Sequence, residues 1–267
     1  RSDMCASGDY TERGIRAADG FQTELVVDTE QYLVPVPSQM AEYAVLTEPM
    51  SVAAKALDEA AKIQSARLPG ASSPEEWLRG KRALVAGLGP IGLLAAFALK
   101  LRGADVIGLD VVDETAARPA LLKRIGGRYV DGRAVKTGAL DDRLGQVDLI
   151  LEATGVASLE FELIDALGIN GIYVLTGIPG GDRPINLDGA GLIRQLVLMN
   201  QVIVGSVNAN RAHFETAVAD LARAEETWKG AVRSVITHRV SAEEFASVIY
   251  KRVPDEIKSV IRWAAPA

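Results

Sequence analysis

Apolar runs and helical patterns alternate through the middle of this 267-residue chain. Residues 83–86 form an apolar run, and after a glycine-rich turn at 87–92 the apolar positions recur at helical spacing. A second apolar run ends at Asp110, and three further buried-strand patterns follow at Val147–Glu152, Ile172–Thr176 and Val202–Val207. This alternation predicts an α/β fold in which helices cover both faces of an open, doubly wound parallel sheet of the Rossmann type.

The turn after the first strand has three glycines in the spacing G-x-G-x-x-G, which is typical of a dinucleotide-binding unit. The first glycine permits a tight turn, the second lets the backbone approach a pyrophosphate, and the third lets the helix pack closely on the sheet. The helix N-terminus favours the pyrophosphate because its free N–H groups and its dipole attract anions. The predicted contacts are Gly87, Gly89, Pro90, Ile91 and Gly92.

Asp110 ends the second strand, 18 residues after Gly92. A carboxylate in this position accepts hydrogen bonds from the ribose 2′-OH and repels a 2′-phosphate. The next two residues, Val111 and Val112, offer no cation. The sequence therefore predicts NAD as the cofactor in preference to NADP, and the alternative is that Asp110 only caps a strand end.

The ends of the later strands supply more candidates, because ligands of such sheets bind outside the carboxyl ends of the strands. Each of the three later strand patterns ends in small or polar residues. The predicted cofactor neighbours are Thr154, Gly155, Thr176, Gly177, Ile178 and Asn208. For each residue taken singly, a simple loop-forming role is the alternative.

Before the glycine turn, the patterns at residues 24–27 and 32–36 predict short strands. From Glu48, apolar positions recur at helical spacing up to Ile63, behind an acidic, proline-containing start that suits a helix N-terminus. Residues 66–80 are polar and rich in Pro, Gly and Ser, which predicts a surface connection.

Beyond the last of these strands, the sequence predicts a helix at 213–226, a strand at 232–240, a second helix at 242–250 and a final strand at 257–263. These strands need not belong to the nucleotide-binding sheet. The alternative is that they belong to the same domain as the N-terminal strands.

The composition, 48% hydrophobic and 24% charged, supports a sizeable core in one or two domains. A net charge of -6 argues against a nucleic-acid-binding surface. No apolar stretch reaches the ~20 residues of a membrane span, and the N-terminal residues lack the apolar core of a signal peptide. The single cysteine, Cys5, excludes an internal disulfide, so a cytoplasmic location is expected.

Metal and acid–base chemistry cannot be assigned from spacing. Cys5, His213 and His238 share no metal-ligand spacing, and no Ser-His-Asp or Cys-His pair emerges. A packing or surface role is the favoured interpretation for both histidines. The residues themselves thus indicate nucleotide binding and leave the reaction open.

A resemblance adds to this picture. The blocks that carry it are RSDMC at 1–5, GDYTERGI at 8–15, LTEPMSV at 46–52, VAGLGPIGLL at 85–94 and VNANRAHF at 207–214. Together they resemble the glucose 1-dehydrogenase branch of the zinc-containing medium-chain dehydrogenases, over nearly the whole chain.

The resemblance implies a particular domain plan. Residues 1–47 are expected to be part of a GroES-like catalytic domain, 48–220 a Rossmann NAD(P)-binding domain, and 221–267 a return to the catalytic domain. It also implies that roughly 90 residues of catalytic domain lie upstream of Arg1, a length comparable to a small domain.

The resemblance implies roles for individual residues. Glu48 matches a position near or on the catalytic zinc, although a helix N-terminal acid favoured by the dipole is the alternative. Cys5 matches the last cysteine of a structural zinc site, and Arg252 matches a basic cofactor contact. Glu12 matches a contact to sugar hydroxyls, and Asn208 a position near both nicotinamide and substrate.

The implied reaction is hydride transfer from a sugar or polyol hydroxyl to NAD(P), with zinc in the intact protein. Val52 and Leu198 replace an acid and a histidine of sugar-binding members, so another aldose, a polyol or a less polar alcohol is an alternative substrate. A zinc-independent enzyme similar to quinone reductases and an inactive nucleotide-binding fragment also stay open. A homodimer or homotetramer is expected, paired through the sheet edge near Val202–Val207.

Overall fold

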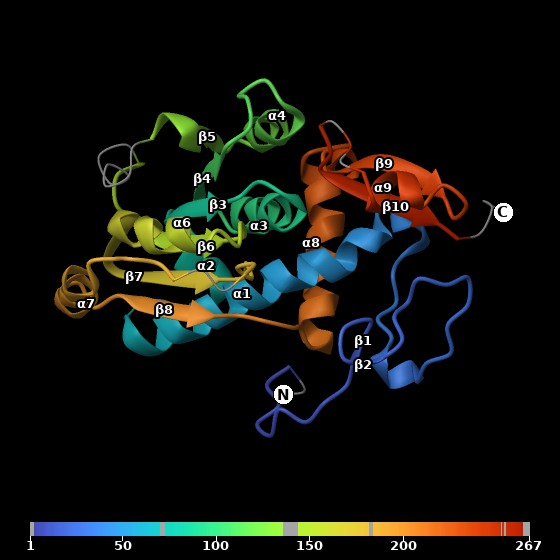
Figure 1. Cartoon of the computed structure of the whole chain (residues 1–267), viewed down its shortest axis with the longest axis horizontal. Helices are drawn as coiled ribbons and strands as arrows, with labels where there is room; N and C mark the ends of the chain where they lie inside the picture. The colour runs from blue at the N-terminus through green and yellow to red at the C-terminus, as the bar shows by residue number, and fades with distance from the viewer. Residues whose placement is uncertain are drawn as a thin grey trace.

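The computed structural model of the chain describes residues 3–69, 73–135, 144–181, 184–251, 253 and 255–263. Its centre is a six-stranded sheet in which every neighbouring pair of strands is parallel, with helices on both faces (Figure 1). The strands are β3 (Arg82–Ala86), β4 (Asp105–Asp110), β5 (Arg128–Asp131), β6 (Val147–Glu152), β7 (Leu167–Leu175) and β8 (Val202–Gly205). The predicted doubly wound parallel sheet is confirmed.

The order of the strands places the candidate site. Across the sheet they lie as β5-β4-β3-β6-β7-β8, so the chain starts at the centre, moves to one edge and returns to build the other half. In such a sheet the ligand crevice lies where the order reverses, at the carboxyl ends of the two central strands. Here these are β3 and β6, which are followed directly by Gly87 and Ala153.

Two apolar clusters, one on each face, hold the sheet between its helices. Ala83 and Val85 of β3 belong to one cluster, whereas Leu84 and Ala86 belong to the other, as expected for side chains that alternate along a strand. The first face is covered by α1 (Thr47–Arg67), α3 (Pro90–Leu101), α4 (Ala117–Arg124) and α8 (Arg211–Thr227), and the second by α6 (Ala157–Glu162) and α7 (Gly189–Leu198). Burial on both faces explains why the strands read as nearly continuous apolar runs.

The predicted helix from Glu48 is confirmed as α1, the longest helix that the structure describes. The predicted surface connection at 66–80 is only partly right. It contains a short helix, α2 (Pro74–Leu78), capped by Ser73, whose hydroxyl accepts the Glu76 N–H at 3.1 Å. Helix α2 buries Trp77 and Leu78, so this connection packs on the core.

The strands predicted at 24–27 and 32–36 are wrong. The described N-terminal elements are β1 (Glu12–Arg13), β2 (Ala17–Ala18) and the 3-10 helices Glu30–Tyr32, Ser38–Met40 and Ala44–Leu46. Leu25 and Val27 are 87% and 94% exposed, and no described strand pairs with their segment. A strand needs a partner for its backbone groups, so the alternating pattern alone does not produce one.

The C-terminal part contains a 3-10 helix, Arg233–Val235, then β9 (Ile236–Ser241), α9 (Ala246–Ile249) and β10 (Lys258–Arg262). Within the described residues, β9 and β10 pair with each other and with no strand of the nucleotide-binding sheet, a possibility that the sequence left open. The helix predicted at 242–250 is reduced to the four residues of α9. None of these residues is buried, and a short helix without tertiary packing is only marginally stable.

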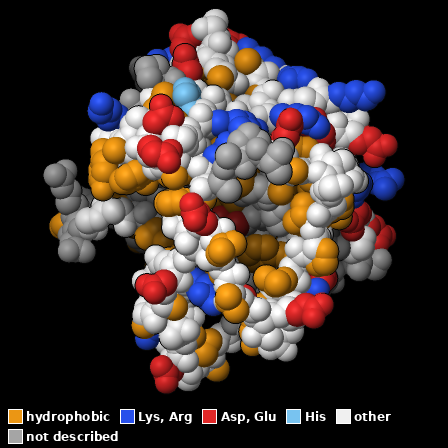
Figure 2. Space-filling model, turned by 90° about the vertical axis from the view of Figure 1, so that its right-hand side faces the viewer, with side chains coloured by type: hydrophobic (Ala, Val, Ile, Leu, Met, Phe, Trp, Pro, Cys, Tyr) orange, Lys and Arg blue, Asp and Glu red, His pale blue; other side chains and the backbone are white. Residues whose placement is uncertain are grey.

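Figure 2 shows the face on which the N-terminal segment and the β9–β10 unit lie, with apolar side chains scattered between charged ones. The exposed apolar side chains of the N-terminal segment include Ile15, Phe21, Leu25, Val27, Tyr32 and Leu33. In the part of the chain that the structure describes, no helix has both the length and the hydrophobicity needed to cross a membrane.

Candidate cofactor site

The glycine turn leaves no room for a side chain on its first or its third glycine. Gly87 has a φ of +87°, and a Cβ atom there would lie 2.8 Å from Cγ2 of Thr154. A Cβ on Gly92 would lie 1.8 Å from the carbonyl oxygen of Gly87, so the start of α3 touches the turn backbone. Gly89 caps α3 and has open space around it, as a residue facing a ligand requires.

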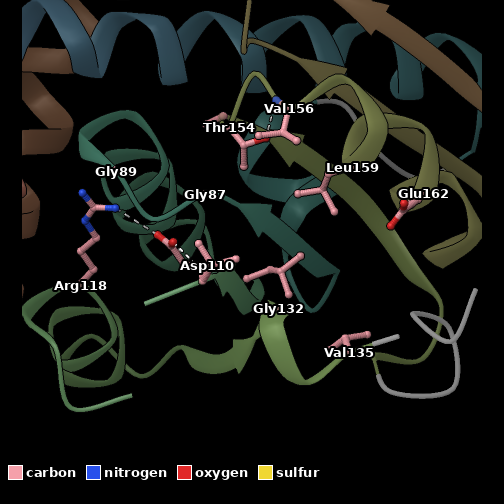
Figure 3. Close-up of a pocket in the computed structure, with 13 residues that line it drawn as sticks. Gly87, Gly89, Asp110, Arg118, Gly132, Val135, Thr154, Val156, Leu159 and Glu162 are labelled. Carbon is pink, nitrogen blue, oxygen red and sulfur yellow. Dashed lines mark hydrogen bonds and ion pairs between the residues drawn. The ribbon is translucent and has the colours of Figure 1, made fainter. Parts of the chain in front are cut away.

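Asp110 lies at the carboxyl end of β4 and is bonded to the same turn. Its Oδ2 accepts the N–H of Leu88 at 2.9 Å, and its Oδ1 accepts the N–H of Val111 at 2.7 Å. The guanidinium of Arg118, from the first turn of α4, lies 3.5 Å from the same Oδ2 (Figure 3). Asp110 therefore fixes the glycine turn in addition to facing the crevice.

A cavity of about 380 Å³ opens between the carboxyl ends of β3, β4, β5 and β6 (Figure 3). Its walls are mostly apolar, with a few polar groups among them. The lining residues are Gly87, Gly89, Leu109, Asp110, Val111, Arg118, Gly132, Val135, Ala153, Thr154, Val156, Leu159 and Glu162. Apolar walls with few convergent polar groups are typical of a site for a flat, partly polar ligand such as adenosine.

The loops after β6 and β7 are joined by a buried carboxylate, Glu152, for which the sequence gives no signal. Glu152 is fully buried, and its Oε1 accepts hydrogen bonds from the Thr154 N–H, from the Thr154 hydroxyl at 2.6 Å and from the Gly155 N–H at 2.9 Å. Its Oε2 accepts the N–H of Gly177 at 3.1 Å. One side chain thus holds both loops that were predicted to contact the cofactor.

The same loops approach each other backbone to backbone. Gly155 has a φ of +65°, and a Cβ atom on it would lie 2.8 Å from the carbonyl oxygen of Ile178. The hydroxyl of Thr176 donates to the Glu152 carbonyl at 2.6 Å, and the Ile178 side chain is 82% exposed. At the carboxyl ends of β6 and β7, the structure therefore brings together the predicted residues Thr154, Gly155, Thr176, Gly177 and Ile178.

Asn208 follows β8 in a loop that is held by a buried lysine. Lys55 of α1, 1% exposed, donates to the carbonyl of Val207 at 2.6 Å and forms an ion pair with Asp3 at 3.1 Å. The side chain of Asn210 also donates to Asp3, at 2.9 Å. Asn208, with a φ of +62°, therefore lies between Val207 and Asn210, which both have these contacts.

The two histidines have structural contacts. His213 is 5% exposed, belongs to the capping box that begins α8, and places Nε2 3.1 Å from Oδ2 of Asp58. His238 places Nδ1 3.0 Å from the hydroxyl of Thr237. The packing role expected for His213 is the one that the structure gives it.

The predicted catalytic and metal residues are dispersed. Glu48 is exposed in the first turn of α1, and Glu12 lies on β1, which forms a two-stranded sheet with β2. Cys5 is an exposed free thiol whose pKa is lowered by its hydrogen bond with Ser7. Arg252 lies outside the described residues.

These side chains do not assemble a zinc site. Within the described ranges, no group of three or more His, Cys, Asp or Glu side chains is placed to hold a metal ion. A structural or catalytic zinc site uses three or four protein ligands. Glu48 and Cys5 therefore stay predictions as metal ligands.

The topology, the glycine turn and the cavity define a Rossmann-type dinucleotide-binding protein. The family model described as glucose dehydrogenase C-terminus matches residues 41–263. The chain is 37% identical over 264 residues to the glucose 1-dehydrogenase of Thermoproteus tenax, covering 97% of this chain and 70% of that relative. The chain belongs to the glucose dehydrogenase family, as its sequence blocks predicted, and is a dehydrogenase by class.

Solved structures agree with this membership. The glucose dehydrogenase of Haloferax mediterranei, solved in complex with NADP, Zn and gluconolactone, superposes with a TM-score of 0.87 at 30% identity, over 99% of this chain and 71% of that one. An alcohol dehydrogenase from Thermotoga maritima gives a TM-score of 0.62 at 23% identity, over 80% of this chain and 55% of that one. At this lower identity, the similarity to the alcohol dehydrogenase shows a shared fold and nothing further.

Proposed function

We propose that this chain binds a nicotinamide dinucleotide and that it acts in hydride transfer between a sugar or polyol hydroxyl and the nicotinamide ring. The observation that carries the proposal is the glycine turn at the reversal point of the strand order, bonded to Asp110 and open to a cavity. The names of its relatives support the sugar class over the quinone reductase alternative.

In this proposal each part of the crevice holds one part of the cofactor. The pyrophosphate lies against Gly89 and the N-terminus of α3, where free N–H groups favour anions. The adenosine occupies the cavity beside Asp110, and the nicotinamide end extends toward the loops held by Glu152. Arg252 is retained as a proposed basic contact.

NAD is the proposed preferred cofactor, because Asp110 places a carboxylate beside the expected ribose position. The Haloferax mediterranei relative was solved with NADP, which supports the nicotinamide dinucleotide class. The two cofactors differ only by the 2′-phosphate, so the preference depends on the charges around Asp110.

The substrate end is proposed from family membership. Glu12 is proposed to contact sugar hydroxyls, and Asn208, next to the anchored Val207, to lie near both substrate and nicotinamide. Gluconolactone and zinc bound to a relative support a sugar substrate and a metal-assisted reaction in the intact protein. Since the described side chains form no metal site, no step is assigned to zinc.

The domain plan 1–47, 48–220 and 221–267 is retained as part of this proposal, together with a cytoplasmic location. We also propose self-association through β8, the edge strand of the sheet. A nucleic-acid partner is not part of the proposal, because the net charge is -6, and a membrane partner is not part of it either, because none of the described helices could span a membrane.

Calorimetric titration tests the core of the proposal. NAD, NADH and ADP-ribose are titrated into the chain, and Glu215→Gln, a change on the exposed face of α8, serves as the matched variant. Saturable binding of all three ligands to both proteins is expected. Absence of binding to a folded chain would contradict the proposal, and NAD-linked oxidation of aldoses and polyols with and without zinc tests the reaction.

A further inference from the structure

The carboxylate that is expected to select NAD already has hydrogen-bond and ion-pair partners within the protein. The Asp110 side chain is 9% exposed, and its oxygens accept two backbone N–H groups while the guanidinium of Arg118 lies 3.5 Å away. A carboxylate that is buried and ion-paired repels a nearby anion less than a free one, because its charge is compensated locally.

Arg118 is held in place by a contact on its other side. Its Nη2 donates to the carbonyl of Glu256 at 2.9 Å, in the segment just before β10. The side chain is 32% exposed and lines the same cavity as Asp110, with its guanidinium directed at that carboxylate (Figure 3). A guanidinium anchored on two sides still has N–H groups free for a ligand and loses little entropy on binding one.

We propose that Arg118 is a specificity-determining residue that lets the cavity accept a 2′-phosphorylated adenosine, and hence NADP as well as NAD. This inference rests on the proposed function. With NAD bound, Arg118 stays paired with Asp110, which accepts the ribose hydroxyl. With NADP bound, the guanidinium donates charge-assisted hydrogen bonds to the 2′-phosphate and compensates Asp110.

Two neighbouring positive charges form ion pairs outside the cavity. Arg133, which follows β5, is paired with Asp131, and Lys123 of α4 is paired with Glu114. Neither cation lines the cavity. Among the described residues, Arg118 is therefore the cation placed to meet a 2′-phosphate.

The test compares 5′-AMP with adenosine 2′,5′-bisphosphate by calorimetry, together with NAD and NADP. These half-cofactors report on the adenosine cavity without needing the nicotinamide or the substrate end. The proteins are the wild-type chain, Arg118→Met, Arg118→Lys and the control Arg124→Met, which removes an arginine from the same helix at a position outside the cavity.

Wild type is expected to bind NADP within about tenfold of NAD, a difference of about 1.4 kcal/mol. Arg118→Met is expected to weaken the bisphosphate and NADP by about tenfold or more, while 5′-AMP and NAD change by about threefold at most. Arg118→Lys should keep an intermediate affinity for both 2′-phosphorylated ligands. Arg124→Met should behave as wild type.

Several outcomes overturn the inference. Equal weakening of 5′-AMP and the bisphosphate in Arg118→Met means that the arginine only supports the fold of the cavity. If the ratio of the affinities for adenosine 2′,5′-bisphosphate and 5′-AMP is unchanged in both Arg118 variants, the 2′-phosphate is bound elsewhere. If Arg118→Met does not fold, the lysine variant decides alone, and a wild-type chain that binds neither half-cofactor contradicts the proposed function itself.

Discussion

At the residue scale, Glu152 joins two loops at the crevice, a role that its place in a buried strand does not reveal. Its carboxylate accepts hydrogen bonds from the loops after β6 and β7, so it fixes the two segments together. Burial, followed by the charge of this carboxylate, also raises the pKa of the neighbouring Glu160. We infer that Glu152 positions the loops and does not itself react.

Glu152→Gln tests this positioning role. An amide NH2 group would face backbone N–H donors, so at least one buried donor loses its acceptor at a cost of about 1–3 kcal/mol. We expect a lower melting temperature and weaker NAD binding, measured by thermal unfolding and calorimetry. Glu215→Gln is the control, and a Glu152→Gln protein that matches it in both measurements would falsify the role.

Alanine substitutions of two glycines in the glycine turn, Gly92 and Gly89, are expected to have different effects. The first should lower stability, and the second should weaken cofactor binding. A methyl group on Gly92 would meet the Gly87 carbonyl at 1.8 Å, so Gly92→Ala must displace α3 and should cost about 1–3 kcal/mol or more. Gly89 has a φ of -65° and nothing within 4 Å of a Cβ atom, so Gly89→Ala should keep nearly wild-type stability.

In the folded Gly89→Ala protein the methyl group lies where the pyrophosphate is proposed to approach, so NAD binding should be lost or strongly weakened. Urea unfolding and calorimetry on both variants check the contrast. Wild-type NAD affinity in Gly89→Ala would remove the pyrophosphate from this turn.

The role of a residue could be predicted from the sequence where a single steric requirement determines the residue type. Gly87 and Gly92 are examples, because each needs a missing side chain at a fixed point of the turn. Arg118 and Glu152 were missed, since their importance depends on which residues tertiary folding places beside them. An arginine eight residues after Asp110 has no sequence signal for reaching back to it.

At the element scale, β5 supports the end of β4 through a tyrosine. The Tyr129 hydroxyl donates to the carbonyl of Asp110 at 3.0 Å and to that of Val112, so β5 fixes the loop that begins at Asp110. Burial, and then the carboxylates of Asp131 and Asp110, raise the pKa of Tyr129 to about 12.

This raised pKa predicts an alkaline dependence of stability. An acid that holds its proton more tightly when folded stabilises the fold fully below its unfolded pKa of about 10, and this contribution is lost as the pH rises toward the folded value. The unfolding free energy should therefore fall between about pH 10 and pH 12, and fall less in Tyr129→Phe. Urea unfolding across this range measures it, with Tyr32→Phe as an exposed control, and equal slopes in all three proteins would contradict the assignment.

The elements were predicted best where burial dominates. Strands β3, β4 and β6 lie between two covered faces, so their apolar runs identify them with little ambiguity. The segment 24–27 alternates just as a strand does, but its apolar side chains are exposed and it lacks a described partner. Alternation records a propensity, whereas a strand also requires hydrogen bonds from a neighbour.

At the scale of the whole molecule, the edge of the sheet at β8 is the surface best suited to self-association. Among the described residues, strand β8 pairs with β7 alone, which leaves its other edge free, and helix α7, which precedes it, carries a row of exposed apolar side chains. Ile193, Val197 and Leu198 of α7 are 63%, 68% and 74% exposed. Ile169 lies close by, since the N–H of the next residue, Asn170, donates to the carbonyl of Met199 at 2.8 Å, just beyond α7.

An edge strand has unpaired backbone N–H and C=O groups, so it pairs readily with a strand of another chain. An exposed apolar helix face beside it also favours association. Pairing of two copies through β8, with the α7 rows packed together, would satisfy the free backbone groups of both strands and bury the apolar row. In such a pair we expect the cofactor cavity of each copy to stay open, since the residues that line it follow β3, β4, β5 and β6, and β7 lies between β6 and the edge strand β8.

Val197→Asp tests this surface. A carboxylate at the centre of the packed row would be desolvated without a partner, so we expect the mutant to be monomeric while wild type forms dimers or tetramers, as measured by light scattering after size exclusion. Val27→Asp, at a position 94% exposed in the N-terminal segment, should keep the wild-type mass. NAD affinity should be equal in all three proteins, because the cavity lies away from the changed surface. A monomeric wild type at micromolar concentration, or a Val197→Asp protein of wild-type mass, would remove β8 and α7 as the interface.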